Sequence, residues 1–220
     1  DRWTSFSVAK SVTATLIGAA VKDGYITSIY DPVTKYIPEL EGSAYDGVSL
    51  RRLLTMTTGV KWNEDYADPK SDVARAGTAD WKGGVNPLVA YMSKLNRETA
   101  PGAKWAYKTG ETDLAVIALG RALAGKGLAQ YASEKLWAPY GMEQDAIWMV
   151  DKAGHERGGC CMSSRDELGS KKKRMSFDRS GSSSTVPGVP TLIGAMAMVW
   201  LAVNPRLARG ITVVRVLPLA

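Results

Sequence analysis

An amphipathic stretch near the start of the chain, residues 7–23, most constrains the fold. Its apolar residues recur every four positions, which predicts a helix with one buried stripe. The stripe consists of Val8, Val12, Leu16 and Ala20. Gly24 follows directly, at the position where a helix commonly ends on a residue with positive φ. The sequence therefore predicts a long helix packed against a hydrophobic core.

The first turn of this helix carries Ser7 and Lys10, whose spacing places both side chains on one face. A hydroxyl at a helix N-terminus lies near free N–H groups and the positive end of the helix dipole, which would stabilise a developing oxyanion. A lysine one turn away, if neutral, can take the hydroxyl proton and turn the serine into a nucleophile. The alternative is a capping serine beside a surface lysine, because Ser170 and Lys173 repeat the spacing in a basic run that we expect to be a solvated segment.

The charge is distributed unevenly along the 220 residues. Residues 1–166 hold 20 Lys+Arg and 20 Asp+Glu, whereas residues 167–220 hold 8 and 2, so the net charge of +6 lies entirely in the last quarter. The body therefore offers no basic footprint for a nucleic acid. The only cysteines, Cys160 and Cys161, are adjacent and predict neither a disulfide framework nor a zinc site.

Short apolar patterns predict further helices after the first one. They lie at residues 50–56, 87–95, 112–124 and 128–137, and a strand is predicted at 146–150. Residues 61–87 show no sustained periodicity and indicate a long loop, whose aromatic residues favour a folded lid. These patterns therefore predict a helical body with one long loop that helps to form a site.

The character of the sequence changes near residue 167, which predicts two regions, 1–166 and 167–220. The second begins with a basic run and a Ser/Gly/Pro-rich linker and ends in apolar sequence. Its apolar run, residues 191–203, is too short to span a bilayer, so we expect a buried helix there and no membrane span. A tail that is not native to the fold, such as a frame-shifted one, is an open alternative.

Five segments in a fixed order resemble the β-lactamase-related serine hydrolases. They are SFSVAKSV, DPVTKYIPEL, VSLRRLLTMTTGVKWNEDYADP, PGAKWAYKTGET and LAQYASEKLWAPYGME. Within that family the sequence is most similar to the branch of 6-aminohexanoate-dimer hydrolases and esterases of class C β-lactamase fold. The resemblance covers residues 1–166 and depends on the ordered set, since no single motif is specific enough.

The resemblance implies a catalytic role for each of three residues: Ser7 as the acylated nucleophile, Lys10 as its base and Tyr107 as the phenol that passes a proton to the leaving group. The ordinary pKa of tyrosine is about 10, and a flanking lysine would lower it. Thr109 stands where the commoner family form has Asn, so a hydroxyl replaces an amide that would help to position substrate. This substitution argues against β-lactam specificity.

The resemblance also implies substrate-binding roles in the aromatic loop. Tyr66 matches a loop tyrosine that closes over amide substrates in the nylon-oligomer hydrolases, and packing of Tyr66 against Trp62 is the alternative. We expect Trp62 and Trp105 to form pocket walls or core. Thr109 completes the predicted substrate-binding set.

Other candidate motifs are set aside. The Lys-Thr-Gly signature at residues 108–110 overlaps the tyrosine motif just before a helix, whereas the family places that signature on a late strand. His155 is the only histidine, and no Gly-x-Ser-x-Gly elbow accompanies it. Glu64, Asp65 and Asp68 lack calcium-loop spacing and are expected to form a solvated face.

The resemblance implies the α+β fold of serine β-lactamases and penicillin-binding proteins, with an antiparallel sheet flanked by helices and a helical subdomain. This sequence holds mostly the helical part, with the sheet strands largely missing. The implied reaction is acyl-enzyme formation on small esters or linear amides, with no metal and no organic cofactor. We expect weak activity, because no strand that would supply the second oxyanion N–H is recognised.

Two alternatives to a hydrolase remain open: a non-catalytic degenerate relative, and a module that binds β-lactams or D-Ala-D-Ala peptides. The chain has no visible signal peptide and begins without Met, so we expect it to be the interior of a longer protein. Its compartment, bacterial cytoplasm or periplasm, and its oligomeric state stay undetermined by the sequence.

Overall fold

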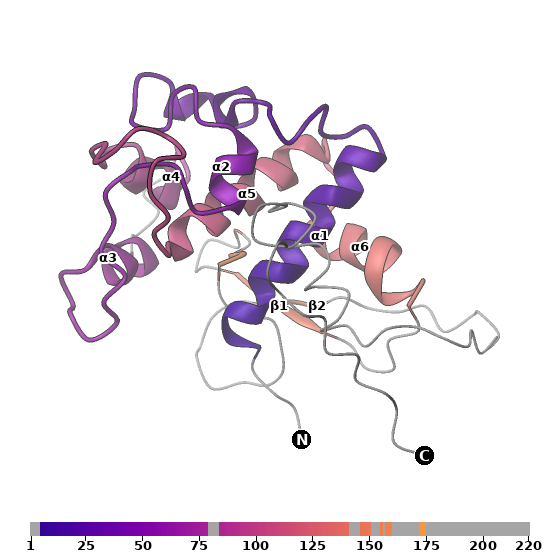
Figure 1. Ribbon diagram of the computed structural model, residues 1–220. Helices are drawn as coiled ribbons and strands as arrows, with labels where there is room; N and C mark the ends of the chain where they lie inside the picture. Colours follow the sequence, from indigo (N-terminus) through magenta and orange to yellow (C-terminus); the bar gives the residue numbers. More distant parts are fainter. Residues whose placement is uncertain are drawn as a thin grey trace, which may run out of the picture.

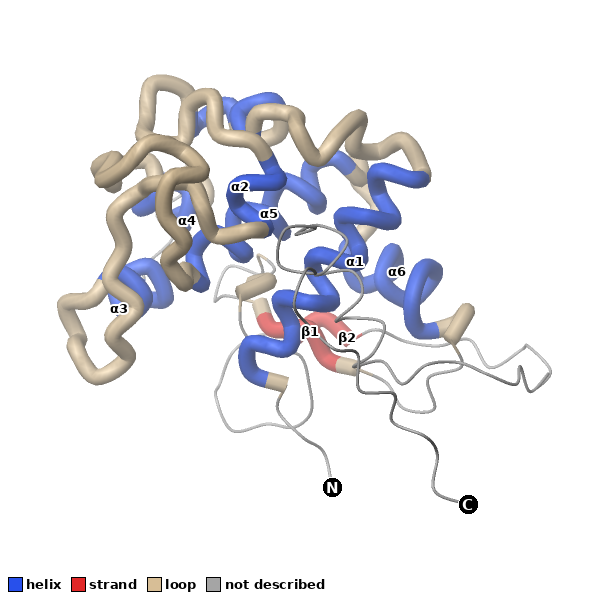
Figure 2. The backbone as a smooth tube through the Cα atoms, viewed as in Figure 1, coloured by secondary structure: helices blue, strands red, loops and turns tan. Residues whose placement is uncertain are grey.

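The computed structural model describes residues 5–78, 84–140, 146–150, 155, 157–159 and 172–174. These residues form a helical body with two short strands (Figures 1 and 2). The helices are α1 (Ala9–Lys22), α2 (Leu50–Leu54), α3 (Asp72–Thr78), α4 (Pro87–Met92), α5 (Thr109–Ala122) and α6 (Leu128–Ala132). Short 3-10 turns cover Phe6–Val8, Val33–Lys35 and Pro38–Leu40, and a π-helical turn covers Ser133–Trp137. The strands are β1 (Ile147–Met149) and β2 (Lys172–Arg174).

Helix α1 matches the predicted helix, with one change at its start. The buried face consists of Ala9, Val12, Thr13, Leu16, Ile17 and Ala20. The expectation for Val8 is wrong, because this side chain is 53% exposed. Val8 ends a 3-10 turn, whose three residues per turn rotate it away from the buried stripe of the α-helix. Gly24 has the expected positive φ of 82°.

The core is organised around two 14-residue helices, α1 and α5, which pack against each other. Helix α5 also contacts α2, α3 and α4, so it lies at the centre of the helical body. Figure 1 shows α1 running across the molecule between the α2–α5 part and α6. The buried residues of these helices form one hydrophobic cluster. This packing fixes how the starts of α1 and α5 lie relative to each other.

Several predicted boundaries change in the structure. The long loop at 61–87 contains α3, which sequence periodicity missed because Ala76 is the buried residue of this short helix. Helix α5 begins at Thr109, three residues before the predicted start at Thr112. The predicted helix at 128–137 divides into α6 and the π-helical turn. The lid is therefore partly helical, and the tyrosine motif runs directly into α5.

The predicted strand at 146–150 is present as β1, which pairs with β2 in antiparallel register, with Ile147 opposite Arg174. In the described part of the chain these are the two strands, in agreement with the expectation of a mostly helical portion. The backbone of Lys172–Arg174, in the basic run, forms β2, and the expectation that this run is a solvated segment stays a prediction.

The expected boundary between residues 166 and 167 stays a prediction. Residues 175–220, including the apolar run at 191–203, lie outside the described residues. Within the described residues, no helix has the length and apolar character needed to cross a bilayer.

Candidate active site

The structure brings together the three residues predicted to be catalytic. Lys10 Nζ donates to Ser7 Oγ at 3.1 Å, and the Tyr107 hydroxyl donates to the same oxygen at 2.7 Å. Ser7 lies in the 3-10 turn before α1 and Lys10 in the first turn of α1. Tyr107 reaches them from the extended segment that precedes α5. A serine oxygen between an amine and a phenol can lose its proton to either one when that group is in its basic form.

Three oxygen acceptors surround the Lys10 amine. They are Ser7 Oγ, Thr109 Oγ1 at 3.2 Å and the carbonyl oxygen of Gly159. An ammonium carries three N–H donors, one for each of these oxygens, so the site can stabilise a proton once Lys10 has accepted it. Lys10 Nζ also lies 4.9 Å from the centroid of the Tyr107 ring. The flanking lysine that contacts the phenol is thus Lys10, whereas the side chain of Lys108 is buried elsewhere.

Glu64 joins the three residues that were predicted to bind substrate. Its carboxylate accepts from the Thr109 backbone N–H at 2.9 Å, and it also accepts from the Thr109 hydroxyl and from Trp62 Nε1. The expectation that Glu64 belongs to a solvated face is therefore wrong. A carboxylate at a helix N-terminus satisfies free N–H groups and interacts favourably with the helix dipole, and Glu64 does this for α5.

Tyr66 and Trp62 both bind this carboxylate. The Tyr66 hydroxyl donates to Glu64 Oε1 at 2.7 Å and lies 3.2 Å from Thr109 Oγ1. Loss of water around the hydroxyl raises the pKa of Tyr66 to about 12, so it stays a neutral donor near pH 7. The Trp62 ring packs against Gly110, where an added Cβ would come within 2.7 Å of Trp62 Cη2. Both predicted substrate-binding aromatics thus lie beside Thr109.

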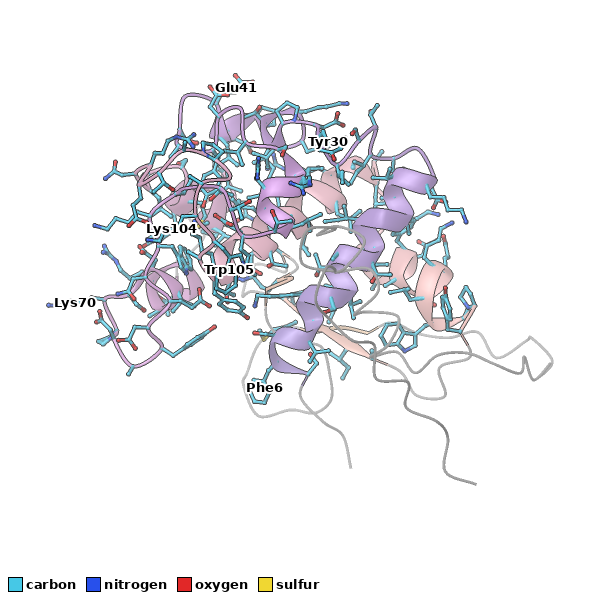
Figure 3. The ribbon with its side chains drawn as sticks, viewed as in Figure 1. Phe6, Tyr30, Glu41, Lys70, Lys104 and Trp105 are labelled. Atoms are coloured by element: carbon cyan, nitrogen blue, oxygen red, sulfur yellow. The ribbon has the colours of Figure 1, made fainter. Side chains whose placement is uncertain are left out.

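Two exposed aromatic side chains flank the site. Trp105 is 62% exposed, and its ring centroid lies 6.5 Å from that of Tyr107. Phe6, next to Ser7, is 65% exposed and has a φ of 44°. Figure 3 shows Phe6 at the start of α1 and Trp105 on the part of the molecule that holds α2 to α5. Trp105 is therefore not a core residue, and a role as a pocket wall stays a prediction.

Sequence reasoning missed the segment that supplies the Gly159 carbonyl. Asp113 of α5 accepts from the Gly159 backbone N–H at 2.7 Å, and Thr13 of α1 donates to the Gly158 carbonyl at 3.3 Å. A Cβ on Gly158 would lie 2.0 Å from Val116, so only glycine fits at this approach. The adjacent glycines in the sequence were the available signal for a close backbone approach.

The described residues contain no group of three or more His, Cys, Asp or Glu side chains that could hold a metal ion. The chemistry that the described site offers is nucleophilic: a serine hydroxyl, an amine, a phenol and a capping carboxylate, arranged around the starts of α1 and α5.

Comparison with known proteins shows the family of the chain. The sequence model of the beta-lactamase family matches residues 1–168. The chain belongs to the beta-lactamase family. Over 173 residues it is 33% identical to the 6-aminohexanoate-dimer hydrolase of Paenarthrobacter ureafaciens, an alignment that covers 76% of this chain and 43% of that protein.

Solved structures of beta-lactamase-family proteins share the fold. A Bacillus anthracis protein assigned as a 6-aminohexanoate-dimer hydrolase aligns with a TM-score of 0.62 and 23% identity, over 74% of this chain and 44% of that one. A class C beta-lactamase from Rhodobacter sphaeroides aligns with a TM-score of 0.50 and 22% identity, over 66% of this chain and 36% of that one. This beta-lactamase-family chain therefore spans less than half the length of these relatives, and its fold class is the predicted one.

Proposed function

We propose that the chain carries the nucleophile centre of a serine hydrolase that forms an acyl-enzyme at Ser7 on small esters or linear amides. The observation that supports this most directly is the position of Ser7 Oγ, within hydrogen-bond distance of both Lys10 Nζ and the Tyr107 hydroxyl. Membership of the beta-lactamase family agrees with this proposal.

In the proposed reaction, Ser7 Oγ attacks the carbonyl carbon of the substrate while its proton passes to the neutral amine of Lys10. The ammonium formed in this step is the form that Thr109 Oγ1 and the Gly159 carbonyl stabilise. The Tyr107 hydroxyl then protonates the departing alcohol or amine and regains a proton from Lys10. Water attacks the acyl-enzyme in the second half of the reaction and restores the Ser7 hydroxyl.

Two observations support the proposed substrate class. The Paenarthrobacter relative is named for hydrolysis of the 6-aminohexanoate dimer, which is a linear amide. The hydroxyls of Thr109 and Tyr66 lie 3.2 Å apart and both donate to Glu64, so their oxygens can accept the N–H of an amide substrate. We therefore favour linear amides and small esters over β-lactams.

The proposal is tested by covalent labelling with a fluorophosphonate, followed by peptide mass spectrometry. Labelling requires a single phosphonylation, so it tests the nucleophile without requiring turnover. We expect the label on Ser7, loss of the label in Ser7→Ala, and labelling at least about 100-fold slower in Lys10→Ala, in line with the usual effect of a general base. Ser11→Ala, one turn further along α1, is the matched control and should label like the wild type.

The contrary outcome is equally clear. If the folded wild-type chain takes up no label at Ser7, the site is not a nucleophile centre, and the chain is a non-catalytic member of its family.

A further inference from the structure

The backbone just before α5 separates two sets of side chains. Lys108 has extended dihedrals, φ −147° and ψ 105°. In extended backbone, successive side chains point to opposite sides. Tyr107 and Thr109 accordingly contact Ser7 and Lys10, whereas Lys108 points into the interior and is 3% exposed. The position of the two active-site hydroxyls is therefore coupled to what holds Lys108.

Lys108 is held by a buried polar cluster. Its amine lies 3.2 Å from Glu111 Oε1 and 3.2 Å from Thr58 Oγ1, and the Thr58 hydroxyl donates to the same carboxylate oxygen. Glu111 and Thr58 are both fully buried. Thr58 Oγ1 in turn accepts from the Val60 backbone N–H at 3.2 Å. The cluster thus ties the segment before α5 to the first turn of that helix and to the loop after α2.

A contribution to folding stability does not explain why this polar cluster is buried. A buried ion pair generally contributes little net stability, since apolar residues of similar volume do as well or better. Glu111 Oε2 is buried and has no hydrogen-bond partner among the described residues, which adds a cost. The hydrogen bonds of this ion pair instead fix the position and orientation of the backbone at residue 108.

We propose that Lys108 and Glu111 are positioning residues that hold the Tyr107 and Thr109 hydroxyls in register with Ser7 and Lys10. The inference rests on the proposed function of that site. A displacement of about 1 Å in a catalytic group can slow a reaction by about 100-fold. Loss of the buried anchor should therefore slow the reaction of Ser7 without removing any group that touches the substrate.

The test is a double-mutant cycle on the rate of fluorophosphonate labelling at Ser7, with Glu111→Gln, Tyr107→Phe and the double variant. If Glu111 acts through Tyr107, the two effects are not additive. We expect Glu111→Gln to label at least about 10-fold more slowly than wild type, and no more than about twofold further slowing when it is added to Tyr107→Phe. Glu98→Gln, in the exposed ion pair with Lys104, is the matched control and should label like the wild type.

The outcomes separate the two proposals. Additive effects, or an unchanged rate in folded Glu111→Gln, overturn the positioning role while leaving Ser7 a nucleophile. Absence of Ser7 labelling in the wild type overturns the proposed function itself. Should Glu111→Gln fail to fold by circular dichroism, the same cycle with Thr58→Val decides the question. This variant keeps Lys108 and Glu111 and removes the three hydrogen bonds of the Thr58 hydroxyl.

Discussion

The Tyr107 hydroxyl donates a 2.7 Å hydrogen bond to Ser7 Oγ across 100 residues of sequence. Each oxygen sits at the start of one of the two long helices, and those helices pack directly against each other. The distance between the two groups is therefore set by helix packing in the core. A substitution that removes one side-chain group of the site and leaves this packing intact should therefore keep the other groups in place.

Replacing Tyr107 with Phe removes this hydroxyl and keeps the ring. We expect the initial rate of Ser7 phosphonylation to fall by about 100-fold or more, in the usual range for loss of a general acid or base, while the thermal midpoint changes little. Stopped-time labelling and circular dichroism measure the two quantities. Tyr30→Phe, on an exposed tyrosine, is the control. Equal labelling rates in both variants would exclude Tyr107 from the reaction.

Replacing Glu64 with Gln removes the carboxylate that caps α5. A neutral amide has one acceptor oxygen, so it cannot satisfy Thr109, Tyr66 and Trp62 together. We expect the KM for a chromogenic ester to rise at least about 10-fold and kcat to change less, because we propose that Thr109 and Tyr66 bind the substrate. Asp65→Asn, on the exposed neighbour, should leave KM unchanged; a similar rise in that variant would contradict the specific role of Glu64.

Replacing Gly159 with Ala introduces a Cβ 2.5 Å from the Thr109 carbonyl oxygen and 3.1 Å from Asp113 Oδ1. The segment must shift, and with it the carbonyl that binds Lys10. We expect a loss of about 1–3 kcal/mol in the free energy of unfolding, measured by urea denaturation, together with slower labelling. Gly120→Ala, in α5 with open space around it, should instead gain up to about 1 kcal/mol. A neutral Gly159→Ala would show that this close approach is not required.

The buried carboxyl of Glu111 predicts a pH dependence of stability. Burial raises its pKa from 4.5 to about 7, against the opposing effects of Lys108 and Thr58. The folded state then binds more protons than the unfolded state between these values, so the free energy of unfolding falls as pH rises through this window and levels off above it. A shift of this size corresponds to about 3 kcal/mol.

In Glu111→Gln this pH-dependent contribution is absent. We therefore expect the stability of the wild type, relative to the variant, to decline between about pH 5 and about pH 7.5. Urea denaturation of both proteins across this range measures it. Parallel stability curves would mean that Glu111 does not titrate in this window.

Local patterns in the sequence account for much of the fold and part of the site. The four-residue repeat through Val12, Leu16 and Ala20 predicts the buried face of α1 because helix geometry alone decides it. The spacing of Ser7 and Lys10 likewise places both on one helix face. The position of Tyr107 came from motif order, which carries information on tertiary structure that periodicity does not.

The missed features are those that depend on distant packing. Glu64 is polar and lies in an irregular loop, and nothing local shows that it caps a helix beginning at Thr109, 45 residues away. Val8 continues the apolar pattern, but the 3-10 turn exposes it. The docking of Gly159 on Asp113 depends on a segment 46 residues away. In each case a contact between separate elements decides what the residue does.

The three acceptors of the Lys10 amine lie 3, 99 and 149 residues away along the chain. The first contact lies within the start of α1, whereas the other two require closure of long loops, so we expect them to form later in folding. We therefore expect Lys10 to gain its full set of hydrogen bonds only after the two long helices have packed. After denaturation we therefore expect helix content to return first and the reactivity of Ser7 to return later, when the Gly159 carbonyl binds Lys10.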